Sequence, residues 1–194
     1  MTAGSGVIHS ELPTDDLLRL GGRLHGFQLW VNLPARSKMK EPRYQGYDAE
    51  EITTVPLANG GSMKVVAGTV HGESGPVETT SPMTYAHASM NPGDVVEWAP
   101  PAGHTALIHV FDGDARVNDE LVTSGQMAVF DRQGGSIRVV AGEAGAQVLV
   151  LGGEPLNEPV ARYGPFVMNT REELVTAVQE FNDGTLVKVG KATL

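Results

Sequence analysis

Short apolar, β-favouring runs recur along the chain and are separated by residues that favour turns. The runs are GFQLWVNL (26–33), SMKVVAGTV (62–70), TALIHVF (105–111), QMAVF (126–130), SIRVV (136–140) and AQVLVLGG (146–153). The punctuating turn motifs are Asn59-Gly60-Gly61, Asn91-Pro92-Gly93-Asp94, Asp112-Gly113-Asp114 and Gly134-Gly135. The densest series lies between about residues 53 and 153. The pattern predicts an all-β protein with one complete barrel or sandwich.

Two segments have helical rather than strand periodicity. Thr170 and Glu173 have the spacing of a capping box, and the apolar residues that follow share one helical face up to Gly184. This predicts a helix over about residues 171–182. Residues 14–20 are polar first and apolar later, and Gly21-Gly22 follows them, which predicts a short helix or an irregular turn.

Composition excludes several classes of protein. The 194 residues carry a formal charge of -9, and no basic stripe is visible, so direct binding to nucleic acid is not expected. The longest strongly apolar stretch is far too short to span a bilayer, and the amino terminus lacks the features of a secretory signal. With no cysteine in the chain, disulfides and thiolate catalysis are excluded, and a cytoplasmic location is the default expectation.

His9 and Glu11 are the candidate site that spacing alone offers. They stand two apart in a strand-like segment, so both side chains are expected on the same face. An imidazole and a carboxylate together suit a divalent metal ion. The alternative is a solvated surface pair with no ligand, because two donors do not make a complete site.

The other histidines and the tryptophans have plainer interpretations. His71 and Glu73 repeat the same spacing in a glycine-rich stretch, which favours solvated surface. Each of the remaining barrel histidines is expected to be hydrogen-bonded or to face solvent: His87, His104 and His109. Trp30 and Trp98 are expected in the core.

Several motifs, in order, resemble those of pirins, a family of cupin proteins built from two β-barrels. They are MTAGSGVIHSE (1–11), LHGFQLWVNLP (24–34), EPRYQ (41–45), GEPLNEP (153–159) and RYGPFVMNT (162–170). The resemblance covers essentially the whole chain. It implies cupin (jelly-roll) barrels, with the amino-terminal barrel present only as a remnant. The domains expected are a remnant and linker over 1–45, a carboxy-terminal barrel over 46–153, and an extension with a helix over 154–194.

In pirins, the histidine and glutamate that match His9 and Glu11 are metal ligands. The resemblance implies that two further ligands come from a His-Pro-His-Arg-Gly stretch upstream of Met1, and no His-x-His occurs in these 194 residues. The expectation is therefore a truncated frame or misplaced start, with an incomplete metal site. In the second barrel, the ligand positions are occupied by Ala99, Pro101, Arg138 and Val140, so that barrel is expected to lack a metal.

The family resemblance also implies the chemistry. Pirins resemble quercetin 2,3-dioxygenases, so the expected substrate is a flavonol-like molecule and the expected cofactor is a divalent metal. Iron is favoured by family, with nickel, zinc, manganese or copper as alternatives. Glu11 is then both a ligand and the candidate catalytic base. The alternative is a non-enzymatic, metal-modulated regulator that binds a protein partner. Homo-oligomers through an exposed sheet edge are a further expectation.

Overall fold

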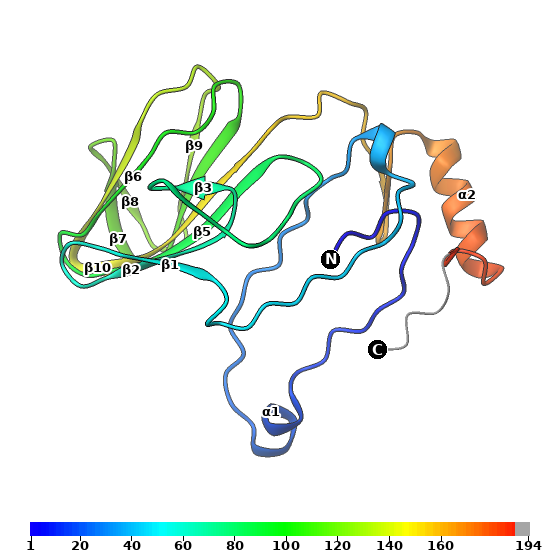
Figure 1. Cartoon of the computed structure of the whole chain (residues 1–194), viewed down its shortest axis with the longest axis horizontal. Helices are drawn as coiled ribbons and strands as arrows, with labels where there is room; N and C mark the ends of the chain where they lie inside the picture. The colour runs from blue at the N-terminus through cyan, green and yellow to red at the C-terminus, as the bar shows by residue number, and fades with distance from the viewer. Residues whose placement is uncertain (189–194) are drawn as a thin grey trace. The chain divides into compact units, whose positions relative to one another are not determined.

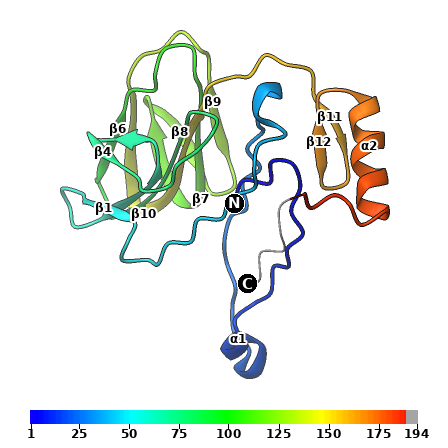
Figure 2. The ribbon, with the colours of Figure 1, turned by 45° about the vertical axis from the view of Figure 1, so that its right-hand side comes forward.

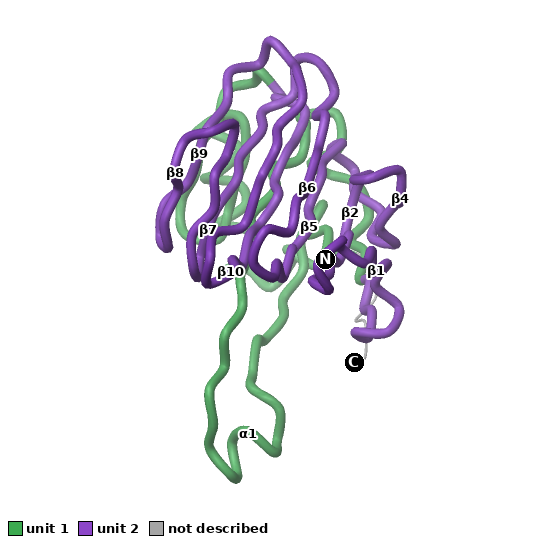
Figure 3. Tube along the Cα trace, turned by 90° about the vertical axis from the view of Figure 1, so that its left-hand side faces the viewer, with its two compact units in different colours: residues 1–44, 157–194 green, residues 45–156 purple. Residues whose placement is uncertain are grey.

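The computed structural model describes residues 1–188. By their internal contacts the residues form two compact units, one made of residues 1–44 with 157–194 and the other of residues 45–156 (Figure 3). Among residues 1–188, no helix is both long and apolar enough to cross a bilayer.

Residues 45–156 form a β-barrel of antiparallel strands, most of them labelled in Figure 1. The strands are β1 (Thr53–Pro56), β2 (Ser62–Ala67), β3 (Thr69–Val70), β4 (Glu73–Ser74), β5 (Met83–Met90), β6 (Val95–Trp98), β7 (Thr105–Val117), β8 (Glu120–Thr123), β9 (Met127–Phe130) and β10 (Ile137–Gly153). The main sheet has the order β1-β2-β5-β10-β7-β8, with β6 paired to β10 and β9 paired to β7. The strands β3 and β4 form a separate small hairpin. The predicted all-β cupin architecture is confirmed.

Two long strands give this sheet its barrel form. The first half of β10 pairs with β6 and its second half with β5, while β7 pairs with β9 and then with β8. Between the halves, the register of β10 against β7 shifts between Ala141 and Ala146. Gly113 has φ +70° there, and a Cβ on it would collide with the Gly145 carbonyl oxygen. A bulge with glycine at the close approach bends both strands from one layer into the other.

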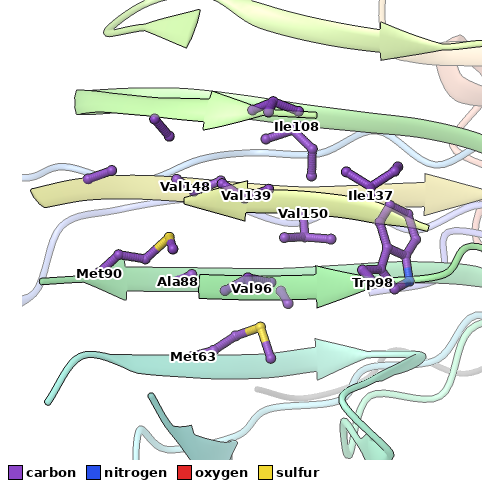
Figure 4. Packing of buried hydrophobic residues seen from close by; sticks show 14 of the residues in the cluster. Met63, Ala88, Met90, Val96, Trp98, Ile108, Ile137, Val139, Val148 and Val150 are labelled. Atoms are coloured by element: carbon purple, nitrogen blue, oxygen red, sulfur yellow. The ribbon is translucent and has the colours of Figure 1, made fainter. Parts of the chain in front are cut away.

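The barrel core lies between these layers (Figure 4). On β5, buried and half-buried positions alternate strictly, because successive side chains of a strand point to opposite faces. Met63, Ile108 and Val150 are among the fully buried side chains, and Trp98 closes one end of the labelled cluster. The prediction of a core position for Trp98 is confirmed.

A buried carboxylate joins two of the predicted turns. Asp94 is fully buried, and its oxygens accept hydrogen bonds from the backbone N–H of Asn59 (2.6 Å), Gly61 (2.9 Å) and Asn91 (2.9 Å). Three charge-assisted bonds satisfy the carboxylate inside the protein. They hold the β1–β2 turn against the β5–β6 turn.

Residues 1–44 and 157–188 contain little regular structure. Their elements are α1 (Asp15–Leu20), the 3-10 turn η1 (Ala35–Ser37), β11 (Ala161–Tyr163), β12 (Phe166–Met168) and α2 (Arg171–Asn182). The helix α2 begins at the predicted capping box, with Thr170 and Glu173 bonded reciprocally. It lies beside the β11–β12 hairpin (Figure 2), where the rings of Phe166 and Phe181 are 6.1 Å apart. Both predicted helices are confirmed.

A buried lysine, Lys38, makes hydrogen bonds that join two segments of this unit. Only 5% of Lys38 is exposed, and its Nζ donates to Asn32 Oδ1 (2.8 Å) and to the Val167 carbonyl oxygen (3.1 Å). Burial lowers the pKa of Lys38, and the negative charges of Glu158 and Glu173 oppose that shift. In the polar stretch over residues 35–45, expected to be a linker, Lys38 is thus a buried anchor among residues that are mostly exposed.

Three local predictions are wrong. Residues 7–13 and 26–33 are extended but are not assigned as strands. They have β-favouring sequence, but a strand also requires a hydrogen-bonded neighbour. Trp30 is 58% exposed rather than in the core, with the Arg162 guanidinium 4.8 Å from its ring centre. Asp112-Gly113-Asp114 is no turn, because β7 runs through it.

Candidate metal centre

His9 and Glu11 lie in the extended segment that precedes α1. His9 Nδ1 is 4.0 Å from Glu11 Oε1, and 32% of the His9 side chain and 63% of the Glu11 side chain are exposed. The two donors therefore approach each other at the surface of their unit. A ligand entering from solvent could reach both.

Gln28 completes this small cluster from the far side of α1. Its Nε2 donates to Glu11 Oε1 at 2.7 Å and to Glu11 Oε2 at 2.8 Å. The segments that lead into and out of α1 run alongside each other (Figures 1 and 3), and this contact joins them across 17 residues of sequence. Gln28 thus contacts both carboxylate oxygens, and His9 lies near Oε1, one of these two.

The donor types and the spacing suit a divalent metal ion. Imidazole nitrogen and carboxylate oxygen bind such ions at about 2.0–2.2 Å, so one ion can bridge two donors about 4 Å apart. Two protein ligands are nevertheless only part of a coordination set. Within residues 1–188, no group of three or more His, Cys, Asp or Glu side chains could hold a metal. By themselves, His9 and Glu11 leave the other coordination positions of an ion to further ligands.

The barrel histidines are engaged elsewhere. His87 Nε2 lies 2.8 Å from Gln147 Oε1, and His109 Nδ1 lies 3.0 Å from the Gln126 carbonyl oxygen. His71 sits in the tight β3–β4 turn with φ 54°, and its Nε2 accepts from the Glu97 backbone N–H at 3.1 Å. The expected hydrogen-bonding role of His87 and His109 is confirmed.

One end of the barrel has a small polar cavity of about 60 Å³. His104 and Asp131 line it together with backbone of Gly134 and Gly135. The Arg138 guanidinium Nε is 3.5 Å from Glu97 Oε1 in a surface ion pair.

Spacing along the sequence did not reveal Gln28. It stands 17 positions after Glu11, and a glutamine within an apolar run has no characteristic motif. Gln28 does lie within residues 24–34, one of the stretches that resemble pirin motifs, where it interrupts an apolar run.

The fold and this cluster define the class of protein as a cupin with a candidate metal centre outside its complete barrel. Residues 85–187 match the family model described as the pirin C-terminal cupin domain. The chain belongs to the pirin family.

Relatives of known name agree with this assignment. The chain is 36% identical to human pirin, over 94% of this chain and 62% of that protein. It is 39% identical to a pirin-like protein of Caulobacter vibrioides, over 95% of this chain and 65% of that one. A crystal structure of quercetin 2,3-dioxygenase from Acinetobacter baumannii superposes with a TM-score of 0.76 at 37% identity, covering 81% of this chain and 55% of that chain. The chain thus spans between 55% and 65% of each of these proteins.

Proposed function

We propose that this chain supplies His9 and Glu11 to a mononuclear metal centre of the quercetin 2,3-dioxygenase type. The observation that carries the proposal is the 4.0 Å approach of His9 Nδ1 to Glu11 Oε1. The similarity to a solved quercetin 2,3-dioxygenase supports the reaction class, an oxygenative opening of a flavonol. Iron is the first candidate metal, and nickel, zinc, manganese and copper are the others.

When bound, a divalent metal would act as a Lewis acid toward the flavonol 3-oxygen. The contribution of this chain is to hold two ligands and to manage a proton. Glu11 would accept the proton of the 3-hydroxyl group on a carboxylate oxygen. Gln28 keeps that carboxylate in one orientation by contacting both of its oxygens.

Two ligands predict weak binding by the 194-residue polypeptide alone. The family resemblance implies two further histidines in a His-Pro-His-Arg-Gly stretch, and a chain extended by that stretch should hold about one metal per chain. Titration of both chains with iron, nickel and zinc measures the difference. Tight one-to-one binding by the 194-residue chain would contradict the incomplete-site interpretation.

The chain contains a matched control for the ligand assignment. His71-Gly72-Glu73 has the same spacing as His9-Ser10-Glu11, but it lies on the β3–β4 hairpin. His9→Ala should lower metal occupancy of the extended chain severalfold, whereas His71→Ala should leave it unchanged. If His9→Ala bound metal as the parent does, the ligand role transferred from the family would be wrong.

A second candidate function is a metal-modulated regulator that binds a protein partner. Exposed apolar side chains in the segment that carries Gln28 favour it, since Leu24 and Trp30 are 74% and 58% exposed. Replacement of Glu11 distinguishes the two functions. Glu11→Ala should abolish oxygen consumption with quercetin under the enzymatic proposal, whereas affinity for a protein partner should survive the substitution under the regulatory one.

A further inference from the structure

We propose that Gln28 is a positioning residue of the metal centre, which presents a single oxygen of Glu11 to the ion. This inference rests on the proposed function, because it takes Glu11 as a metal ligand. It goes further by assigning a role to a residue that is itself neither ligand nor base.

The hydrogen-bond geometry shows what Gln28 does to the carboxylate. Gln28 Nε2 is almost equidistant from the two oxygens, at 2.7 Å from Oε1 and 2.8 Å from Oε2. A donor in that position lies across the open side of the carboxylate. A cation chelated by both oxygens would have to occupy the same space. With Gln28 in place, Glu11 can therefore offer one oxygen at a time.

The binding direction that Gln28 leaves open on the Glu11 carboxylate leads toward His9. Oε1 is the carboxylate oxygen found 4.0 Å from His9 Nδ1. Rotation of the carboxylate about its own axis would break at least one of the two contacts with Gln28. The glutamine thus fixes the relative orientation of the two candidate ligands, although it enters from the other side of α1.

The chemistry of the donor suits a metal centre. A lysine or arginine would bind the carboxylate more strongly, but its charge would repel a divalent cation and compete for Glu11. A neutral amide donates hydrogen bonds without that repulsion. Residues that orient metal ligands in this way commonly contribute about 10- to 100-fold to metal affinity.

The test removes the donor and keeps the size of the side chain. Gln28→Met is unbranched and of similar length, and it should weaken Zn²⁺ binding by the 194-residue chain roughly tenfold. Dissociation constants are measured by NMR titration of the histidine ring protons, which reports weak binding and identifies the histidine that responds. Gln133→Met replaces an exposed glutamine of the barrel unit and should have no effect.

A second ion separates positioning from a merely structural role. Ca²⁺ prefers bidentate carboxylates, so freeing the second oxygen of Glu11 in Gln28→Met should leave Ca²⁺ affinity unchanged or raise it. The ratio of Zn²⁺ to Ca²⁺ affinity should then fall about tenfold. A parallel loss of both affinities, or a lowered thermal midpoint that accounts for the Zn²⁺ loss, would overturn the inference.

The ligand variants distinguish this inference from the proposed function. If His9→Ala and Glu11→Ala leave Zn²⁺ binding unchanged, the proposed function fails, and this inference fails with it. If both variants abolish binding while Gln28→Met stays within twofold of the parent chain, only the role of Gln28 is wrong.

Discussion

The barrel unit and the first 33 residues of the other unit have similar apolar, β-favouring runs, yet only the barrel buries them. In residues 62–67 every second side chain is buried, and the strand pairs with neighbours on both sides. In residues 26–33 the same kind of sequence pairs with no strand. Its large apolar side chains remain exposed: Phe27, Leu29, Trp30 and Val31.

The difference shows that β-favouring sequence is only half of what a strand needs. The backbone groups of an extended segment are satisfied by a neighbouring strand, and side chains are covered by a second layer. The barrel contains both within residues 45–156. The segments around α1 contain neither, and the candidate metal cluster lies on them. The candidate pair His9 and Glu11 therefore lies on backbone that forms no strand.

The largest expected effect comes from removing the Asp94 hydrogen bonds that join two turns of the barrel. Asp94→Ala would leave three backbone N–H groups without their acceptor inside the protein, at a cost of about 3 kcal/mol or more in the free energy of unfolding. Urea unfolding followed by circular dichroism measures this. Asp48→Ala, at an exposed aspartate of the same unit, should change the midpoint little. A loss as small as that of the control would mean that the two turns hold each other without Asp94.

The next effect concerns the uncovered segments. Exposed apolar side chains on backbone that forms no strand favour association, so the chain should self-associate in a concentration-dependent way. Leu24→Ser should weaken the association about 10- to 150-fold, since burial of one leucine contributes about 1.5–3 kcal/mol. Sedimentation equilibrium gives both dissociation constants.

The barrel supplies the control for that experiment. Leu121 on β8 is 56% exposed, comparable to Leu24, but it belongs to a paired strand. Leu121→Ser should therefore leave association unchanged. A chain that stays monomeric at every concentration would show that exposure of residues 24–31 does not create a self-interaction surface.

The sequence correctly predicted elements that depend on interactions between residues close together in the chain. The capping box at Thr170 and Glu173 located the start of α2, because its hydrogen bonds join residues three apart. The barrel strands were likewise visible as apolar runs between glycine turns. The long β7 was not, because the glycine at position 113 is typical of a turn but here serves a bulge against Gly145.

Contacts between residues far apart in the chain were not predicted from the sequence. Burial of Lys38 depends on Asn32 and on the backbone of Val167, which lies 129 positions away. The contact between Gln28 and Glu11 likewise depends on how the chain returns after α1. The pair His9 and Glu11 could be proposed from spacing alone, but spacing does not state which residue orients them.

The smallest expected effect is a pH-dependent change in the thermal midpoint. It concerns Glu173 at the start of α2, in the same unit as His9 and Glu11. The backbone N–H of Thr170, with that of Asn169, lowers the pKa of Glu173 below its usual 4.5. A carboxylate with a lowered pKa stabilises the fold above its unfolded-state pKa, and that contribution is lost as the pH falls through the lowered value. Glu173→Gln keeps a capping-box acceptor but removes the charge. The variant should have a slightly lower thermal midpoint than the parent at neutral pH, and the two midpoints should converge in acid. Glu172→Gln, one residue earlier in the same first turn, controls for the interaction of any carboxylate with the helix dipole. A midpoint difference between parent and Glu173→Gln that persists unchanged into acid would show that the charge of Glu173 does not stabilise the start of α2.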